Sequence, residues 1–588
     1  MKTTIVAINS KYIHSALAPW YLKYSCGGEC GQVLVKEFTI NDSADTILAD
    51  IYRTNPDVVA FGCYIWNISL VLELAANLKK VLPETGILLG GPEVSFDGIG
   101  IMNGNPSVDY ILAGEAEVSF KRLLLHLSRK AFALKDIPGL THREGEAVVS
   151  DGSYPLVEDL DSIPSPYTGE MLSKLENRIV YYEASRGCPF SCAYCLSSTF
   201  DGVRRFSLER VKADLLKLVG AGVRQIKFVD RTFNAGRQRT KEIFAFIISM
   251  AGGLKGQVPN FHFEVAADLF DDEMIEILSG APEGLIQFEI GVQSTHGPTL
   301  DAIERKTDLD RLFRYSGKLR DLGSIHLHMD LIAGLPGEDF HTFRCSFNQV
   351  YRQRPHQLQL GFLKMLKGSK IRREADTYGY SFKAQPPYEI LKNRYLSFEQ
   401  VLELKGVEEM LERYYNSARF VKTLEFIHTK IYDEPFDFYL KLYKYYSGKG
   451  YLGQKFSARQ CYSVLMDFLT GNCVQKDLAL AGELLKLDFL SSDNSNNLPE
   501  GLSRNIRPGF KERCFEFLKT EGNVERYLPE FIGLPAKQVI KQVHFEAFSF
   551  DLTESCEQIT KAERVILFNY AGKNRVTGLY PYTAVEGF

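Results

Sequence analysis

The segment EASRGCPFSCAYCLSS, residues 183–198, decides how this sequence is interpreted. It places Cys188, Cys192 and Cys195 at the spacing C-x3-C-x2-C, directly after a predicted strand. A cubane 4Fe–4S cluster takes its thiolate ligands from a short loop of this kind. Three thiolates leave one iron without a protein ligand, and that open position suits cofactor chemistry. Incidental buried thiols are one alternative. A zinc site is another, but structural zinc takes four ligands and no nearby Cys or His supplies the fourth cleanly.

The sequence around this loop alternates predicted strands with predicted helices. Strands are expected at 178–185, 224–230, 260–266, 285–291, 325–331 and 356–363. Six such units fit a partial, TIM-like (β/α)6 barrel whose active face lies at the carboxyl ends of the strands. From about residue 386 the apolar residues recur every three or four positions, which predicts a mostly helical C-terminal domain.

The N-terminal part shows an earlier alternation of the same kind. Its strand candidates are Thr4–Ile8, Val33–Ile40, Asp57–Cys63, Gly86–Leu89 and Tyr110–Leu112, and helical patterns occupy 44–53, 67–82 and 115–130. Five such strands suit an α/β, flavodoxin-like (Rossmann-type) domain with ligands at the strands' carboxyl ends. The Pro, Gly and Ser residues that follow predict a linker with a short hairpin. The expected divisions are therefore 1–130, 131–177, 178–385 and 386–588.

Composition limits the kind of protein. The 588 residues are 45% hydrophobic and 24% charged, which is typical of a soluble multidomain protein, and the net charge of -4 gives no general attraction to nucleic acid or membranes. No run approaches 18 apolar residues, and the N-terminal MKTTIVAINSKYIH lacks the apolar core of a secretory signal. We therefore expect a cytoplasmic protein whose eleven cysteines form no disulfide framework.

The cysteine loop at the end of a first barrel strand resembles that of the radical-SAM superfamily. In that family S-adenosylmethionine (SAM) chelates the open iron, and reductive cleavage gives methionine and a 5′-deoxyadenosyl radical. The resemblance implies that Tyr194 stacks on the adenine. It extends to FVDRTFN, 228–234, and FEIGVQS, 288–294, at later strand ends. The further positions that it implies for SAM contacts are Asp230, Glu289, Gln293 and Arg305.

The N-terminal domain, placed before such a barrel, resembles that of the cobalamin-dependent radical-SAM group. The resemblance rests on GCYIWN (62–67), GGPE (90–93) and GEAE (114–117), each after a predicted strand. It implies cobalamin contacts from these loops and from the loop after the first strand, at Tyr12, Gly62, Tyr64, Gly90, Gly91, Pro92, Glu93, Gly114 and Glu115. Many cobalamin domains supply a histidine to cobalt through D-x-H-x-x-G, but this sequence has no such motif. We therefore expect no histidine on cobalt, and we interpret His14 as an ordinary loop residue.

The resemblance implies an enzyme that methylates an unactivated substrate carbon, with methylcobalamin as the methyl donor and the 5′-deoxyadenosyl radical as the hydrogen acceptor. A radical rearrangement or cyclisation is an alternative within the group, and a non-catalytic cobalamin or redox sensor is an alternative of another class. The implied partners are a reductant such as flavodoxin or ferredoxin and a substrate that is a small metabolite, a peptide or a modified tRNA. A monomer is expected. The C-terminal part resembles a domain of unassigned function found in a subset of the group.

Two features are left open by these motifs. His326 and His328 alternate along a predicted strand, which favours barrel-interior packing or a polar substrate contact over metal ligation. The run YLKLYKYYSGKGYL, 439–452, interleaves Lys with Tyr. It predicts a solvated amphipathic helix, with RNA stacking as the alternative.

Overall fold

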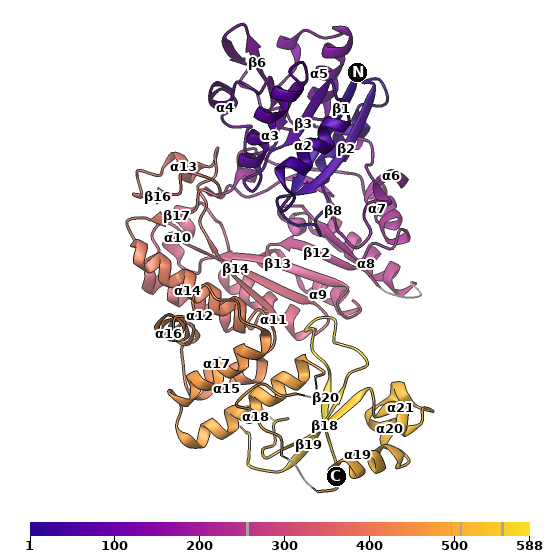
Figure 1. Cartoon of the computed structure of the whole chain (residues 1–588), viewed down its shortest axis with the longest axis vertical. Helices are drawn as coiled ribbons and strands as arrows, with labels where there is room; N and C mark the ends of the chain where they lie inside the picture. The colour runs from indigo at the N-terminus through magenta and orange to yellow at the C-terminus, as the bar shows by residue number, and fades with distance from the viewer. Residues whose placement is uncertain (254–257, 496, 506–507, 554–557) are drawn as a thin grey trace.

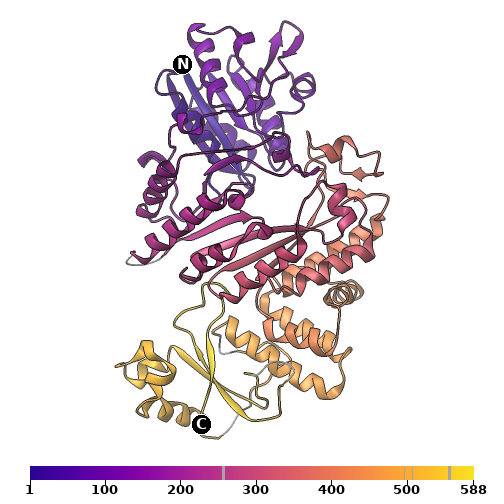
Figure 2. The same ribbon diagram turned by 180° about the vertical axis from the view of Figure 1, so that it is seen from behind.

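The computed structural model describes the whole chain except residues 254–257, 496, 506–507 and 554–557. Three parts follow one another along the longest axis of the molecule (Figures 1 and 2). The N-terminal domain lies at one end, the barrel lies in the middle, and the C-terminal domain lies at the other end. None of the helices among the described residues is long and apolar enough to cross a membrane.

The N-terminal domain contains the predicted parallel sheet. Its strands are β1 Lys2–Asn9, β2 Gln32–Thr39, β3 Val58–Gly62, β4 Gly86–Gly90 and β5 Tyr110–Leu112. The order β2-β1-β3-β4-β5 is the flavodoxin-like order, so the predicted fold class is confirmed. Helices pack on both faces of the sheet, and an apolar core lies between the helices and each face. The helices are α1 Ala18–Ser25, α2 Ala44–Arg53, α3 Ile68–Val81, α4 Gly98–Gly104 and α5 Glu117–Arg129.

The hairpin predicted within 131–177 is present, but it belongs to the first sheet. Its strands are β6 Leu140–Glu144 and β7 Ala147–Ser150, and β6 pairs antiparallel with β5. An unpaired β5 would leave a free sheet edge, and the hairpin covers that edge. The N-terminal domain therefore extends to about residue 150, and the connecting segment to the barrel, with α6 Gly169–Leu172, is shorter than predicted.

The middle domain is an open barrel of six parallel strands in consecutive order, as predicted. The strands are β8 Ile179–Tyr182, β11 Gln225–Phe228, β12 Asn260–Val265, β13 Ile286–Gln293, β14 His326–Ala333 and β15 Gln357–Phe362. Their outward side chains, including Phe228, Phe263 and Phe288, are fully buried beneath the surrounding helices. Those helices are α7 Leu208–Gly220, α8 Arg237–Gly252, α9 Asp272–Ser279, α10 Gly297–Ala302, α11 Leu309–Asp321 and α12 Phe340–Tyr351.

The inner face of the same sheet is polar. Strand side chains alternate between faces, and in β13 every second residue is buried while its neighbours are partly exposed. The alternate positions carry amide, imidazole and charged groups, namely Gln225, Lys227, Asn260, His262, Glu264, Gln287, Glu289, His326, His328, Asp330, Gln357 and Gln359. His326 and His328 thus lie on the barrel-interior face, as predicted. An inner wall of this composition suits water or a polar ligand rather than an apolar core.

The C-terminal domain is mostly helical, as predicted. After a short segment with α13 Lys370–Arg373, β16 Ser381–Phe382 and β17 Ile390–Lys392 come α14 Phe398–Tyr414, α15 Val421–Lys430, α16 Pro435–Gly448, α17 Ala458–Thr470, α18 Gln475–Ser492, α19 Phe510–Lys519, α20 Asn523–Tyr527 and α21 Ala536–Val539. An antiparallel sheet that the sequence did not predict ends the chain, with β18 Val543–Phe548, β19 Arg564–Asn569 and β20 Tyr582–Val585.

The Lys–Tyr run of 439–452 is a packed amphipathic helix over most of its length. Tyr439 and Tyr446 of α16 are fully buried. Their hydroxyls lie 3.0 Å from that of Tyr351 and 2.7 Å from that of Tyr414, respectively. These two rings are therefore unavailable for stacking on RNA bases, which removes support from the RNA alternative.

An ion network joins the first domain to the barrel. The hairpin of β9 Ser185–Gly187 and β10 Val203–Arg205 carries Arg186, which lies 2.6 Å from Glu117, 3.0 Å from Glu183 and 3.3 Å from Glu115. Arg204 of the same hairpin also pairs with Glu115, at 2.5 Å. The Arg186 side chain is only 11% exposed, so the surrounding carboxylates, rather than water, stabilise its charge. The network fixes the first domain over the start of the cysteine loop.

We expect Arg186→Gln to destabilise the chain, because it leaves Glu117 and Glu183 buried without their cation. Breaking a buried ion pair in this way costs roughly 3–5 kcal/mol. Urea titration followed by near-ultraviolet circular dichroism measures the loss. Arg129→Gln is the matched control, because Arg129 of α5 is 57% exposed and pairs with Glu29 at 3.7 Å. Equal stability of the two variants would contradict the proposed role of the network.

Candidate active site

The three cysteines lie on one loop at the carboxyl end of the first barrel strands. Gly187 directly before it has a φ of +95°, and a Cβ there would collide with the carbonyl oxygen of Gly202. Ser198 closes the loop by donating to the carbonyl oxygens of Cys192, at 2.8 Å, and Cys195, at 2.6 Å. Cys192 is buried, whereas Cys188 and Cys195 are partly exposed, and all three are free thiols. Among the described residues, no group of three or more His, Cys, Asp or Glu side chains has the geometry to hold a single metal ion.

Three of the predicted SAM residues lie together beside this loop, namely Tyr194, Gln293 and Arg305. Arg305 Nη1 lies 3.7 Å from the Cys192 sulfur and 3.4 Å from the Tyr194 hydroxyl, and its Nη2 donates to the carbonyl oxygen of Gly291. Gln293 folds back over Gly291, at a bulge in β13 where its own φ is +71°. Arg305 Nε and Gln293 Oε1 are buried without a hydrogen-bond partner among the described residues. Buried donors and acceptors of this kind are normally satisfied, so both fit a polar ligand beside the loop.

Glu289 does not lie with these residues. Its carboxylate lies 2.9 Å from Lys227 Nζ and 3.0 Å from His262 Nε2, deeper in the barrel. Burial opposes ionisation there, but His262 and Lys227 hold the pKa of Glu289 far below its usual range. The SAM contact inferred for Glu289 remains a prediction, and in this structure the carboxylate already has two partners.

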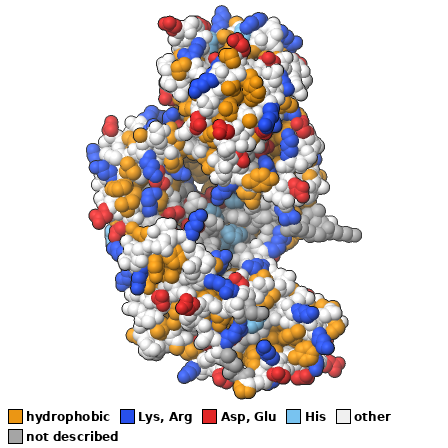
Figure 3. Space-filling view, viewed as in Figure 1, with side chains coloured by type: hydrophobic (Ala, Val, Ile, Leu, Met, Phe, Trp, Pro, Cys, Tyr) orange, Lys and Arg blue, Asp and Glu red, His pale blue; other side chains and the backbone are white. Residues whose placement is uncertain are grey.

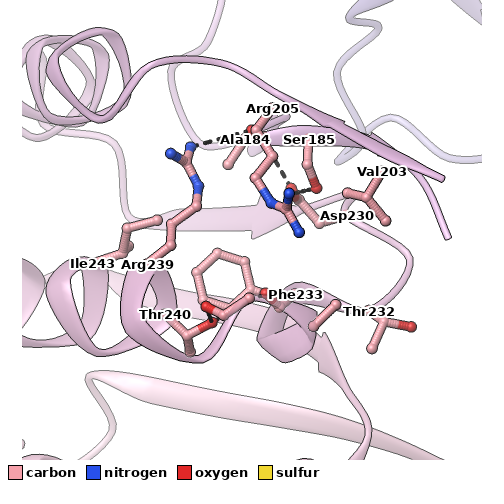
Figure 4. Close-up of a pocket in the computed structure, with 12 residues that line it drawn as sticks. Ala184, Ser185, Val203, Arg205, Asp230, Thr232, Phe233, Arg239, Thr240 and Ile243 are labelled. Atoms are coloured by element: carbon pink, nitrogen blue, oxygen red, sulfur yellow. Dashed lines mark hydrogen bonds between the residues drawn. The ribbon is translucent and has the colours of Figure 1, made fainter. Parts of the chain in front are cut away.

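The carboxylate of Asp230 also has hydrogen-bond partners within the protein. The carboxylate is 2% exposed and accepts from the main-chain nitrogen of Ala184 at 2.9 Å and from the Ser185 hydroxyl at 2.5 Å. Figure 4 shows Asp230 turned toward these two residues, with Arg205 and Arg239 nearby. Burial raises the pKa of Asp230 to about 6. Asp230 therefore holds the main chain that leads into the cysteine loop, and its contact with SAM remains a prediction.

The predicted cobalamin residues lie along the carboxyl edge of the first sheet. Tyr12 follows β1 and is 68% exposed, whereas Tyr64 follows β3 and stacks on Trp66 at 4.5 Å between ring centroids. The sequence interpretation did not select Trp66, although it is 45% exposed and lies within the quoted GCYIWN. Exposed aromatic rings at this edge fit a large, flat and partly apolar group.

The other predicted cobalamin residues have protein neighbours. After β4, Gly91 has a φ of +109°, and a Cβ there would lie 2.6 Å from the Cys63 carbonyl oxygen, so this turn requires glycine; Gly62, Gly90 and Pro92 lie at the same edge. Glu93 is buried, accepts from the Tyr388 hydroxyl and lies 3.4 Å from Lys367 Nζ. After β5, Gly114 approaches the Pro155 main chain, and Glu115 belongs to the ion network. Cobalamin contacts from these positions remain predictions.

The two carboxyl edges face each other. Glu115, which follows β5, lies 3.3 Å from Arg186, which follows β8. The loop after β1 also contacts β8, since His14 Nδ1 lies 2.8 Å from the Tyr181 hydroxyl. Glu93, which follows β4, contacts Tyr388 and Lys367, which both follow β15. The cysteine loop and the aromatic edge therefore border one region between the domains.

Sequence reasoning missed several residues that position this region. Arg186, Glu117 and Arg204 join the domains, and Lys227 and His262 hold Glu289. The available signal was weak: a charged residue at alternate positions of a predicted strand predicts an inner face, but not its partner.

Comparison with known proteins assigns the same regions. Residues 3–124 match the family model "B12 binding domain", residues 182–348 match "Radical SAM superfamily", and residues 376–568 match "Protein of unknown function (DUF4080)". Among curated proteins, the chain is 26% identical over 464 residues to the cobalamin-dependent radical SAM methyltransferase TokK of Streptomyces tokunonensis. That match covers 74% of this chain and 64% of TokK, so the chain spans less than two thirds of this relative.

Two solved structures share the fold. The cobalamin-dependent SAM radical enzyme OxsB superposes with a TM-score of 0.59 at 14% identity, covering 83% of this chain and 79% of OxsB. The radical SAM methyltransferase TsrM from Kitasatospora setae superposes with a TM-score of 0.55 at 15% identity, covering 66% of this chain and 82% of TsrM. At these identities the likeness concerns the fold alone.

We expect anaerobically reconstituted protein to hold about four irons and four sulfides per chain, as one cubane on three thiolates requires. Replacing Cys188, Cys192 and Cys195 together with Ala removes these ligands, so iron analysis and the visible absorption of the cluster are expected to fall to background. Cys345→Ala is the control, since that cysteine is exposed on α12. A full cluster in the triple variant would refute the ligand assignment.

A second expectation concerns His14. Its ring stacks on Tyr181, and its Nδ1 contacts the Tyr181 hydroxyl, so the side chain is already engaged. Electron paramagnetic resonance of the Co(II) form of bound cobalamin is expected to show no strongly coupled axial nitrogen. A three-line nitrogen splitting that disappears in His14→Ala would show instead that this histidine leaves Tyr181 and binds cobalt.

Proposed function

We propose that this chain, a radical SAM protein with an N-terminal cobalamin-binding domain, is a methyltransferase that methylates an unactivated carbon of its substrate. Its domains imply three cofactors: a 4Fe–4S cluster, SAM and cobalamin. When bound, the cluster and SAM supply hydrogen-atom abstraction, and cobalamin supplies the methyl group. A reductant such as flavodoxin or ferredoxin and a cytoplasmic location belong to the same proposal.

One observation carries the proposal: the cysteine loop and the exposed aromatic edge of the first sheet border the same region. A methyl donor and a hydrogen-abstracting group act on one carbon only if both reach it. The contacts of His14 with Tyr181 and of Glu93 with Tyr388 support a fixed relation between the two domains. The sequence similarity to a named methyltransferase, TokK, favours methyl transfer over the other radical outcomes.

Within this proposal, the residues of the chain bind and orient the cofactors. Cys188, Cys192 and Cys195 hold the cluster. The Arg305 guanidinium and the Gln293 amide offer a buried donor and a buried acceptor to SAM beside Tyr194. Tyr64 and Trp66 form a stacked pair of rings that would contact the bound cobalamin. The protein contributes position and shielding, and the cofactors contribute the bond-breaking chemistry.

Isotope labelling of the SAM methyl group tests which class of molecule is methylated. Reconstituted enzyme is incubated anaerobically with dithionite, cobalamin and SAM that carries a deuterated methyl group. Separate pools of small metabolites, peptides and tRNA are supplied, and mass spectrometry follows both 5′-deoxyadenosine and the deuterated methyl group. We expect 5′-deoxyadenosine together with a deuterated methyl group on carbon in one pool, and neither product from the triple cysteine variant.

The other outcomes identify other functions. Formation of 5′-deoxyadenosine with an altered but unlabelled product would replace methylation by a rearrangement or cyclisation. Failure to form 5′-deoxyadenosine in every pool, with cluster and cobalamin bound, would refute the enzyme proposal and favour a sensor.

A further inference from the structure

A cavity lies at the opposite end of the barrel from the cysteine loop. It has a volume of about 330 Å³, and its lining includes Arg224, Gln225, Asn260, Gln287, His326 and Arg575. Gln225, Asn260 and His326 begin strands β11, β12 and β14, so the cavity opens at the amino ends of the strands. Active sites of βα barrels lie at the carboxyl ends, so this cavity is separate from the candidate active site. Figure 3 shows the molecule hollowed between barrel and C-terminal domain, with histidine side chains inside the hollow.

The C-terminal domain supplies one wall of this cavity. The loop between β19 and β20 extends to the barrel, as the yellow segment in Figures 1 and 2 shows, and carries Arg575. The main-chain nitrogen of Arg575 donates to Glu283 Oε1 at 2.6 Å, and its guanidinium donates to the Val258 carbonyl oxygen at 2.7 Å. These two bonds hold the Arg575 guanidinium at the cavity although it comes from another domain.

The lining consists of cations and hydrogen-bonding groups without an acid. Arg224 and Arg575 form no ion pair with a described residue, and no Asp or Glu is among the lining residues. Two of the amides are oriented by the fold, since Gln225 donates to Asn260 at 3.1 Å and Asn260 donates to the Gly284 carbonyl oxygen at 3.0 Å. Both arginines are exposed at this open concave site, where two guanidiniums attract negative charge and can bind carboxylate or phosphate with paired hydrogen bonds.

His326 adds a neutral polar group to this lining. Its ring stacks on His356 at 5.0 Å between centroids, and its Nδ1 is buried without a hydrogen-bond partner among the described residues. Burial lowers the pKa of His326 to about 3, so the imidazole is neutral and offers one donor and one acceptor. A buried ring nitrogen of this kind fits a ligand oxygen.

We propose that this cavity binds the anionic group, phosphate or carboxylate, of a small molecule. The group is either the distal end of the substrate or part of a separate effector. Gln287 of this lining and Glu289 lie on the same inner face of β13, so polar side chains extend from the cavity toward the carboxyl ends of the strands. The binding proposal stands independently of the proposed methyl transfer.

Pyrophosphate tests the site. Its binding to the holoprotein is measured by isothermal titration calorimetry in a buffer free of phosphate, with citrate as the carboxylate probe. We expect Arg575→Gln and Arg224→Gln each to weaken binding of at least one probe by roughly tenfold or more, since each removes a charge-assisted bond. Arg526→Gln is the matched control, because Arg526 lies in the same C-terminal domain, is 61% exposed and pairs with Glu586 at 2.9 Å.

A second measurement covers the case in which a variant misfolds. Phenylglyoxal modifies exposed arginines of the wild-type protein, and peptide mass spectrometry reports whether a bound probe protects Arg224 and Arg575 but not Arg526. Absence of binding by both probes, or equal binding and labelling at all three arginines, would overturn the proposal.

The rate of 5′-deoxyadenosine formation then distinguishes whether the anionic group belongs to the substrate or to a separate effector. A rate altered by the probe without any substrate identifies an effector site, and an unaltered rate identifies the substrate end. If no 5′-deoxyadenosine forms under any condition, the methyltransferase proposal fails while the binding result still stands.

Discussion

The ion network of Arg186 with Glu115, Glu117 and Glu183 is the interaction on which the arrangement of this protein depends. Each of these side chains is less than one fifth exposed, and all three carboxylates share the Arg186 guanidinium, so removal of Arg186 leaves buried negative charge uncompensated. Arg186 lies two residues before Cys188, and Glu115 and Glu117 follow the last parallel strand of the first domain. One network therefore links the cysteine loop to the edge at which the first domain presents its aromatic rings.

The two faces of the barrel sheet differ in polarity. Its outward side chains are apolar and pack against the helices, whereas most of its inward side chains are polar. Opposite charges pair inside it, as Lys227 and Glu289 do, and Glu264 has a pKa raised to about 7 by burial. A barrel filled with apolar side chains would be more stable, so the polar wall indicates a space kept for a hydrophilic ligand.

The predictable parts of the fold and site depend on residues close together in sequence. Cys188, Cys192 and Cys195 lie within eight positions, and the strand–helix alternation predicted the order of both sheets. Contacts between residues far apart in the sequence could not be predicted from it. Examples are the tertiary contacts of Arg186 with Glu117, of Asp230 with Ala184 and of Arg575 with the barrel. For Asp230 and Glu289, a carboxylate on a predicted barrel strand was recognised, but the sequence does not say whether its partner is a cofactor or the protein. The C-terminal sheet was missed because the helical pattern before it was extended to the end of the chain.

We propose that cobalamin and the cluster share one region between the first two domains. Their magnetic interaction tests it most directly. Protein loaded with both cofactors is poised so that Co(II) and the reduced cluster are present together, and its electron paramagnetic resonance spectrum is compared with those of samples that carry one cofactor each. We expect both signals to broaden through dipolar coupling. A spectrum equal to the sum of the separate signals would contradict it.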